Sequence, residues 1–428
     1  MKRTRFIAVA AVAIACLSHS VKARAGSSAC STTINRGNLI RCALEASLTS
    51  KAERQGLEAA KGRQEAASPV LPSNPVLALS GARREAAGQG PVINWYATLS
   101  QEIEIAGQRG ARKRAADAER EAQEKAVAMT DREVAAAAWR AYFEALAARE
   151  EVRLGEQLEA LTGKVAVATR AAADKGLVSG IDADVADIAH ARVVQERIGA
   201  VRREQQAKAA LLSSMGFEPR RELSIEGELV PIAGVEAFAA KQDPRVVDER
   251  PEIQALEASG RAYEARASMY RRARVPNATL SVFVQNDGFN ERVFGVGLSM
   301  PIPLPQPVGR TYAGEIAESE ALSRRSQTEA DRTRRELRLD LANALSAYAS
   351  LRAQSELYTA DRLGRAEQSL RAIASEIEAG RLGTRDAIVS QQALVDLLRA
   401  GFETRKNLAL GSVDLALASG YPLERGAP

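Results

Sequence analysis

The sequence predicts a mixed α and β fold built from a duplicated helix–strand–strand–helix–helix unit. Three observations predict it: an internal repeat, two pairs of strands with alternating polarity, and long helical stretches without proline. Residues 175–217 align with residues 379–421 at an offset of 204 residues and without a gap. Both segments end in a glycine followed by an aromatic residue, Gly216-Phe217 and Gly420-Tyr421. A shared start and a shared end indicate duplication more strongly than scattered identities between alanine-rich helices.

Composition supports a largely helical protein. The 428 residues are 46% hydrophobic and 26% charged, but only 4% aromatic, which is typical of extended helices rather than of a conventional globular core. The formal net charge is +5, yet residues 1–25 contain five basic side chains and no acidic one. The remaining chain has 54 basic and 54 acidic residues, so its charge does not indicate a nucleic-acid partner.

The first 25 residues have the layout of a secretory signal peptide. A basic start, Met1–Arg5, precedes a short apolar run over residues 6–17, and Ala23 and Ala25 provide small residues at a cleavage site. We therefore expect cleavage after Ala25. Lipidation at Cys16 is a less favoured alternative, because the run lacks the expected leucine three positions before that cysteine.

After cleavage the chain keeps two cysteines, Cys30 and Cys42, in an oxidising compartment. A disulfide between them is one possibility, and a bridge that closes a loop of this size stabilises a protein by about 3 kcal/mol. Two free thiols are the other.

The first repeat is expected over residues 26–216. Its expected elements are a helix over 37–67, strands near 74–82 and 92–105, a long helix over about 109–173 and a second helix over 182–214. Pro69, Pro72 and Pro75 end the first helix. At 1.5 Å per residue, the long helix spans on the order of 100 Å.

The second repeat is expected over residues 250–421, after a linker over 217–249 and before a tail over 422–428. Its expected elements are a helix over 251–272, strands near 275–285 and 292–303, a helix over 313–379 and a last helix over 386–418. Arg250-Pro251-Glu252 suits a helix start, with proline in the first position and an acid in the first turn.

The strands alternate apolar and polar residues over about ten positions. On the strand near 92–105 the apolar residues are Ile93, Trp95, Ala97, Leu99, Ile103 and Ile105, and on the strand near 275–285 they are Ala278, Leu280, Val282 and Val284. A tilted strand of that length spans the apolar core of a bilayer. A hairpin packed on the helices in water shows the same pattern. Four strands cannot close a barrel, so we expect a barrel shared between chains.

Sequence motifs for catalysis and metal binding are lacking. There is no P-loop, no HExxH and no CxxC, and His190 is the only histidine after the leader. We expect no enzymatic activity, no metal site and no cofactor. The helices carry alanine-rich stripes between Arg/Glu-rich faces, which suits either a coiled-coil rod or the wall of a cylinder.

Four motifs carry a resemblance to a known family. They are Asn74-Pro75 before the first strand, the Ser100–Arg109 stretch SQEIEIAGQR, Arg250-Pro251-Glu252, and Pro301-Ile302-Pro303-Leu304, which ends the fourth strand. With the duplicated element order, they make the chain similar to the TolC family of outer-membrane efflux channels. The SQEIEIAGQR stretch is most similar to the heavy-metal cation efflux branch.

The resemblance implies a homotrimer in the outer membrane. Each chain would give four strands to a twelve-stranded barrel and its helices to a long α-helical periplasmic barrel. The implied function is that of a passive conduit in a tripartite efflux system, which exports metal cations or small toxic compounds. Its partners would be a periplasmic adaptor (membrane fusion) protein, an inner-membrane pump of the resistance-nodulation-division (RND) type, and outer-membrane lipid.

The resemblance also implies where the tunnel narrows. The helix breaks at 175–184 and 381–386 correspond to hairpin tips, where Asp182, Asp184, Arg385 and Asp386 are candidate aperture charges. Asp182 and Asp386 also suit helix N-caps. The acidic pair usual in the family falls where this chain has Val389 and Gln392. The alternative function is a periplasmic or lipid-anchored coiled-coil scaffold or adaptor without a pore.

Overall fold

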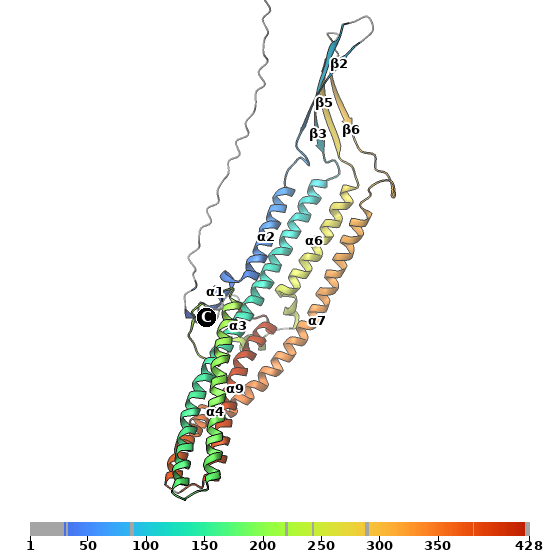
Figure 1. Ribbon diagram of the computed structural model, residues 1–428. Helices are drawn as coiled ribbons and strands as arrows, with labels where there is room; N and C mark the ends of the chain where they lie inside the picture. The colour runs from blue at the N-terminus through green and yellow to red at the C-terminus, as the bar shows by residue number, and fades with distance from the viewer. Residues whose placement is uncertain are drawn as a thin grey trace, which may run out of the picture.

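The computed structural model describes residues 30, 33–85, 90–218, 221–241, 244–286, 291–379 and 381–423. The predicted signal peptide with Cys16, and residues 424–428 of the predicted tail, lie outside this part of the chain. The described chain is elongated, with a β-sheet at one end and two helical hairpin turns at the other (Figure 1). The predicted mixed α and β fold is confirmed.

On either side of a linker, each half contains a helix, then two strands, then long helices. The first half contains β1 (Thr33–Ile34), α1 (Leu39–Ala46), α2 (Leu48–Ala67), β2 (Val76–Arg84), β3 (Val92–Ile103), α3 (Gln108–Asp174) and α4 (Gly180–Ser214). The linker contains β4 (Ser224–Ile225), α5 (Val235–Ala240) and a 3-10 turn, η1 (Pro244–Glu249). The second half contains α6 (Pro251–Ala273), β5 (Ala278–Asn286), β6 (Arg292–Ser299), α7 (Ala313–Leu357), α8 (Ala360–Glu378) and α9 (Thr384–Ser419).

Two helices predicted as continuous are broken. The predicted 37–67 helix is α1 and α2, because Ser47 leaves the helical conformation and its side chain accepts a hydrogen bond from the Ser50 N–H at 3.4 Å. The predicted 313–379 helix is α7 and α8, because Thr359 caps α8 in the same way, through the Arg362 N–H. Neither break contains proline or glycine, and each depends on a hydroxyl cap.

The strands are shorter than predicted at the end near the helices. β5 begins at Ala278 because Pro276 precedes it, and β6 ends at Ser299 because Pro301 and Pro303 have no N–H to donate to a neighbouring strand. Among the described helices, none is both long enough and apolar enough to cross a membrane.

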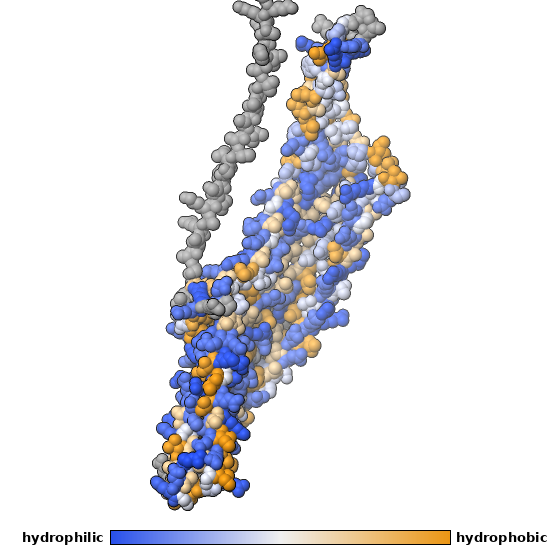
Figure 2. Space-filling model, in the orientation of Figure 1, coloured by the Kyte–Doolittle hydropathy of each residue, from blue (hydrophilic) through white to orange (hydrophobic). Residues whose placement is uncertain are grey.

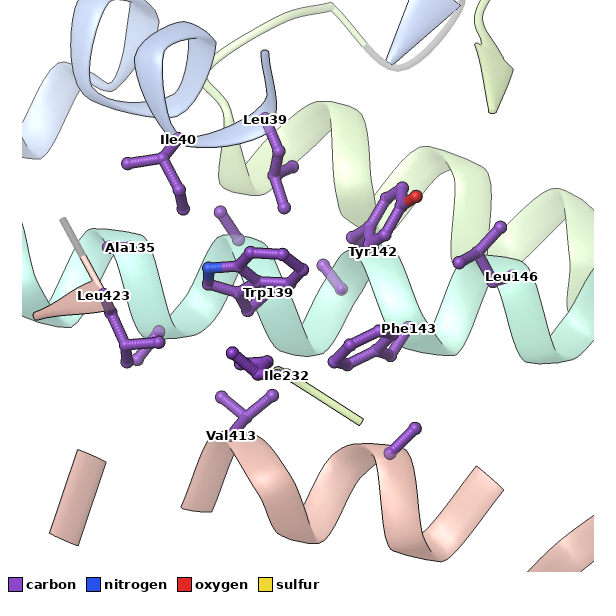
Figure 3. Packing of buried hydrophobic residues seen from close by; sticks show 14 of the residues in the cluster. Leu39, Ile40, Ala135, Trp139, Tyr142, Phe143, Leu146, Ile232, Val413 and Leu423 are labelled. Atoms are coloured by element: carbon purple, nitrogen blue, oxygen red, sulfur yellow. The ribbon is translucent and has the colours of Figure 1, made fainter. Parts of the chain in front are cut away.

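The largest apolar core lies midway along the molecule. Trp139, Tyr142 and Phe143 of α3 form an aromatic cluster, with the Trp139 ring centroid 5.9 Å from Tyr142 and 5.4 Å from Phe143. Leu39 of α1, Ile232 of the linker and Val413 of α9 pack around it (Figure 3). The Tyr142 hydroxyl donates to the Glu226 carbonyl at 2.6 Å. This core joins both repeats to the linker.

The linker also pairs with the N-terminal segment. β4 runs parallel to β1, with Thr33 opposite Ser224 and Ile34 opposite Ile225. This pair was not predicted from the sequence, because a strand of two residues shows no recognisable alternation of apolar and polar side chains.

Candidate functional site

The four strands β2, β3, β5 and β6 form one antiparallel sheet in the order β2-β3-β5-β6. Its register aligns the apolar residues of all four strands in shared rows. Leu77 lies opposite Leu99, Leu99 opposite Val282, and Val282 opposite Val296. The next row contains Leu79, Ala97, Val284 and Phe294. Because side chains alternate along each strand, these rows form an apolar face over the middle of the sheet.

That apolar face is exposed. The side chains of Val296 and Phe294 are 78% and 75% exposed, although such residues are normally buried. The opposite face carries Thr98, Ser100, Ser281 and Gly297 in the same register. The sheet extends beyond the ends of the helices in Figure 1, and no described helix packs on it. A continuous apolar face of this kind indicates contact with lipid or with another apolar surface.

At the opposite end, the α3–α4 turn carries the first group of tip charges. Arg170 of α3 binds Asp184 of α4 at 2.8 Å, and it also pairs with Asp187. The hydrogen bonds that Arg170 donates to Asp187 and Asp184 raise the pKa of Arg170 above its usual value. Thus Asp184 lies in a three-residue ion cluster within one hairpin. Asp182, in the first turn of α4, lies outside this cluster.

The α8–α9 turn carries the second group. Arg381 makes two hydrogen bonds of 2.7 Å to the carboxylate of Glu376, which lowers the pKa of Glu376. Arg385 and Asp386 are exposed in the first turn of α9. Neither side chain forms an ion pair or hydrogen bond with another residue of the described chain. The structure therefore does not join these two candidates to Asp182 or Asp184 within one chain.

The alternative prediction that Asp182 and Asp386 are N-caps is wrong. Ser179 is the N-cap of α4 and accepts a hydrogen bond from the Ile181 N–H at 3.2 Å, while Gly383 is the N-cap of α9. Each aspartate lies three residues further on, where a carboxylate interacts favourably with the positive end of the helix dipole.

Four charged residues of the tips were not predicted from the sequence: Arg170, Asp187, Glu376 and Arg381. Arg170 precedes Asp184 by 14 residues across the turn, so a helical hairpin brings the two side chains together. The signal for this ion pair is therefore the similar distance of Arg170 and Asp184 from the predicted turn, on opposite sides of it.

The two hairpins are held together by apolar residues. A cluster between α3, α4, α8 and α9 contains Leu158, Val165, Leu370, Ile373 and Leu398. The charges described above lie on its surface. His190, the histidine named in the sequence analysis, lies 3.1 Å from the Thr162 hydroxyl through Nδ1. Within the described chain, no three His, Cys, Asp or Glu side chains gather as a metal site.

Cys30 and Cys42 form a disulfide with their Cα atoms 5.3 Å apart. Cys42 belongs to α1 and is fully buried in the central core. The bridge therefore ties the segment before β1 to the helix that packs on Trp139.

No family model matches the chain. The cobalt-zinc-cadmium resistance protein CzcC of Cupriavidus metallidurans is 26% identical over 306 residues, which are 70% of each chain. The outer membrane protein VceC of Vibrio cholerae has a TM-score of 0.72 at 19% identity, over 90% of this chain and 95% of its own. The open MtrE outer membrane channel of Neisseria gonorrhoeae has a TM-score of 0.72 at 18% identity, over 91% and 90%.

VceC is an outer membrane protein and MtrE is an outer membrane channel. The chain thus has the fold of outer-membrane channels, and the resemblance to the TolC-type family that its sequence indicated is confirmed.

Proposed function

We propose that this protein is the outer-membrane channel component of a tripartite efflux system, a passive conduit from the periplasm to the exterior. The observation that carries the proposal is the exposed apolar face of the four-stranded sheet, at the end of the molecule away from the helical tips. A water-soluble scaffold would have to cover this face with a helix, and no described helix does so.

The strand directions support a closed ring of copies. Successive strands in the order β2-β3-β5-β6 are antiparallel, so β2 and β6 run in opposite directions at the two free edges. β6 of one copy can therefore pair with β2 of the next in the same antiparallel pattern. Three copies would supply twelve strands, which closes a barrel and removes every free edge. The polar face would line the lumen and the apolar face would contact outer-membrane lipid.

The helices would continue this conduit into the periplasm, with the two repeats, residues 26–216 and 250–421, each contributing one hairpin. The adaptor protein and the RND-type inner-membrane pump would meet the conduit at the hairpin tips. Asp182, Asp184, Arg385 and Asp386 would surround the aperture there. In a trimer each carboxylate is repeated three times, which favours the passage of cations.

The cargo proposed for the conduit is metal cations or small toxic compounds. The printed name of CzcC refers to resistance to cobalt, zinc and cadmium, and the strand-to-helix stretch resembles the heavy-metal branch. The chain contains only two histidines and three cysteines, the residues that bind such ions tightly. This low number supports passage of the ions rather than their capture.

Membrane fractionation with heat-modifiability tests this function. The unheated protein should run in detergent as an oligomer of about three times the monomer mass, and should reside in the outer membrane. Purified oligomer added to a planar bilayer should give discrete ion-conducting steps. Release by osmotic shock as a monomer or dimer would instead support the scaffold or adaptor without a pore.

A further inference from the structure

The loop between β6 and α7 is an unusual feature of the sheet edge. It contains four alternating prolines, at positions 301, 303, 305 and 307. Each proline fixes its own φ and lacks an N–H, so the segment cannot extend β6. The N–H groups of Val308 and Gly309 donate to the Pro305 carbonyl at 3.1 and 2.9 Å. At Gly309, a Cβ would come within 2.2 Å of the Leu304 carbonyl oxygen, so the turn needs a glycine there. The loop is therefore a preorganised arm, and it projects past β6 in Figure 1.

The arm carries apolar side chains that its own chain does not cover. Ile302 is 82% exposed and Val308 is 79% exposed, and Met300 and Leu304 are also exposed. They form the apolar patch beside the base of the sheet in Figure 2. Holding such a cluster rigidly in water is unfavourable unless another surface buries it.

A second apolar group lies at the opposite edge of the sheet, just before β2 and at its first residue. Val70 is 69% exposed, and Leu71 and Val76 are exposed as well. The sheet register places Val76 in one row with Ser100, Ser281 and Gly297. The chain therefore enters the sheet through β2 and leaves it through β6 at the same level. The arm and the 70–76 segment are thus two apolar surfaces at one height on opposite edges.

We propose that the arm is an intersubunit clasp: Ile302, Leu304 and Val308 of one copy pack on Val70 and Leu71 of the next copy around the ring. This inference rests on the proposed head-to-tail ring and identifies a contact below the barrel strands. When β6 of one copy lies beside β2 of the next, the arm leaving β6 points across the segment that enters that β2. A rigid arm loses little conformational entropy on docking, because its prolines have already restricted it.

Cysteine cross-linking of the full chain in detergent tests the clasp. The double variant Leu71→Cys with Ile302→Cys, treated with a short bismaleimide, should give covalent dimers and trimers on a denaturing gel. Each single variant should remain a monomer. The matched control pairs Leu71→Cys with Val296→Cys, which is 78% exposed but lies on the membrane face of β6, and should also remain a monomer.

A second measurement separates a protein partner from lipid. A fluorescent bimane label at Ile302→Cys should keep its emission in vesicles that contain brominated phospholipid, whereas a label at Val296→Cys should be quenched. Two results would refute the clasp if the chain still forms oligomers: no cross-link in the double variant, or a label at position 302 that is quenched as strongly as the label at position 296. In that case the proposed function stands. If the unmodified chain is a monomer, both fall.

Discussion

Two buried arginines, Arg132 and Arg250, bind the C-terminal end of α9 and stabilise it. Arg132 of α3 is only 3% exposed. Its guanidinium donates to the carbonyls of Tyr421, Ala416 and Leu417 at 2.9, 3.1 and 3.0 Å. Arg250 donates to the Ala418 and Leu417 carbonyls at 2.6 and 2.9 Å. These bonds give the Leu417 and Ala418 carbonyls at the end of α9 a donor. They add a further donor to the Ala416 and Tyr421 carbonyls, which also accept from the backbone N–H groups of Tyr421 and Leu423.

We expect Arg132→Met to loosen the end of α9 by about 3 kcal/mol. A hydrogen bond to a charged group contributes roughly 1.5–3 kcal/mol, but three bonds from one side chain are not additive. Methionine keeps the apolar stem, and Arg250 still reaches Leu417 and Ala418. The loss should therefore equal one to two such bonds.

Hydrogen exchange measured by mass spectrometry on the assembled protein checks this value. A local destabilisation of about 3 kcal/mol should speed exchange in peptides covering residues 415–421 by on the order of 100-fold. The control is Arg140→Met, which removes an exposed ion pair between the same two helices, α3 and α9, with Asp414 as the partner at 2.5 Å. Exposed pairs are worth less than about 1 kcal/mol, so exchange should change at most a few-fold. Equal effects of the two substitutions would refute the idea that burial of the cap sets its strength.

Three further predictions concern charge and covalent linkage. Burial disfavours ionisation of Glu252, but its hydrogen bonds and charge interaction with Arg250, together with Arg132, lower its pKa below 4.5 overall. The contribution of Glu252 to the free energy of unfolding should thus be present above pH 4.5 and lost as the pH falls through the lowered pKa. Between neutral and acidic pH, the melting temperature of Glu252→Gln should therefore fall less than that of the unmodified protein. Substituting Arg170→Gln removes the cation that pairs with Asp184 and Asp187 in every copy, so reversal potentials in a planar bilayer should show higher cation selectivity than in the unmodified channel. In the double variant Arg170→Gln with Asp184→Asn, the cation selectivity should return toward that of the unmodified channel. Unchanged selectivity in Arg170→Gln would place this cluster away from the ion path. Finally, Cys30 and Cys42 should not react with maleimide in denaturant until a reductant is added, and Cys42→Ser with Cys30→Ser should lower the melting temperature; labelling without reductant would favour the two free thiols.

The sequence predicted those features that depend on local pattern. Glycine and proline mark most boundaries, and the α3–α4 turn contains Gly176, whose φ of 70° suits glycine. The strands were found because their polarity alternates. What stayed hidden depends on contacts between distant residues: the β1–β4 pair, the aromatic core built on Trp139, and the caps at Ser47 and Thr359. A serine or threonine within a helical pattern is ordinary, and only the surrounding packing decides whether it becomes a cap.

In the candidate functional site, too, features set by local pattern were predicted and features set by contacts between helices were not. The apolar face of the sheet followed from alternation alone, since a period of two fixes which residues share a face. The ion pairs at the tips required knowledge of how two helices face each other, so Asp184 was identified without its partner Arg170. Asp182 and Asp386 were predicted at the N-cap, whereas the helices begin three residues earlier, after Ser179 and Gly383, so each aspartate lies within the first turn.

The distribution of exposed apolar side chains connects the fold to the proposed assembly. Midway along the molecule, large apolar residues such as Trp139 and Phe143 are buried, so the core there is complete within one chain. At the sheet, at the arm and near the α3–α4 turn they are exposed, as at Phe294, Ile302 and Ile181. A single chain therefore builds its own centre but leaves surfaces unburied at both ends. This is the pattern expected if membrane, neighbouring copies and partner proteins cover the two ends, because each exposed apolar surface lies where the proposed conduit meets one of them.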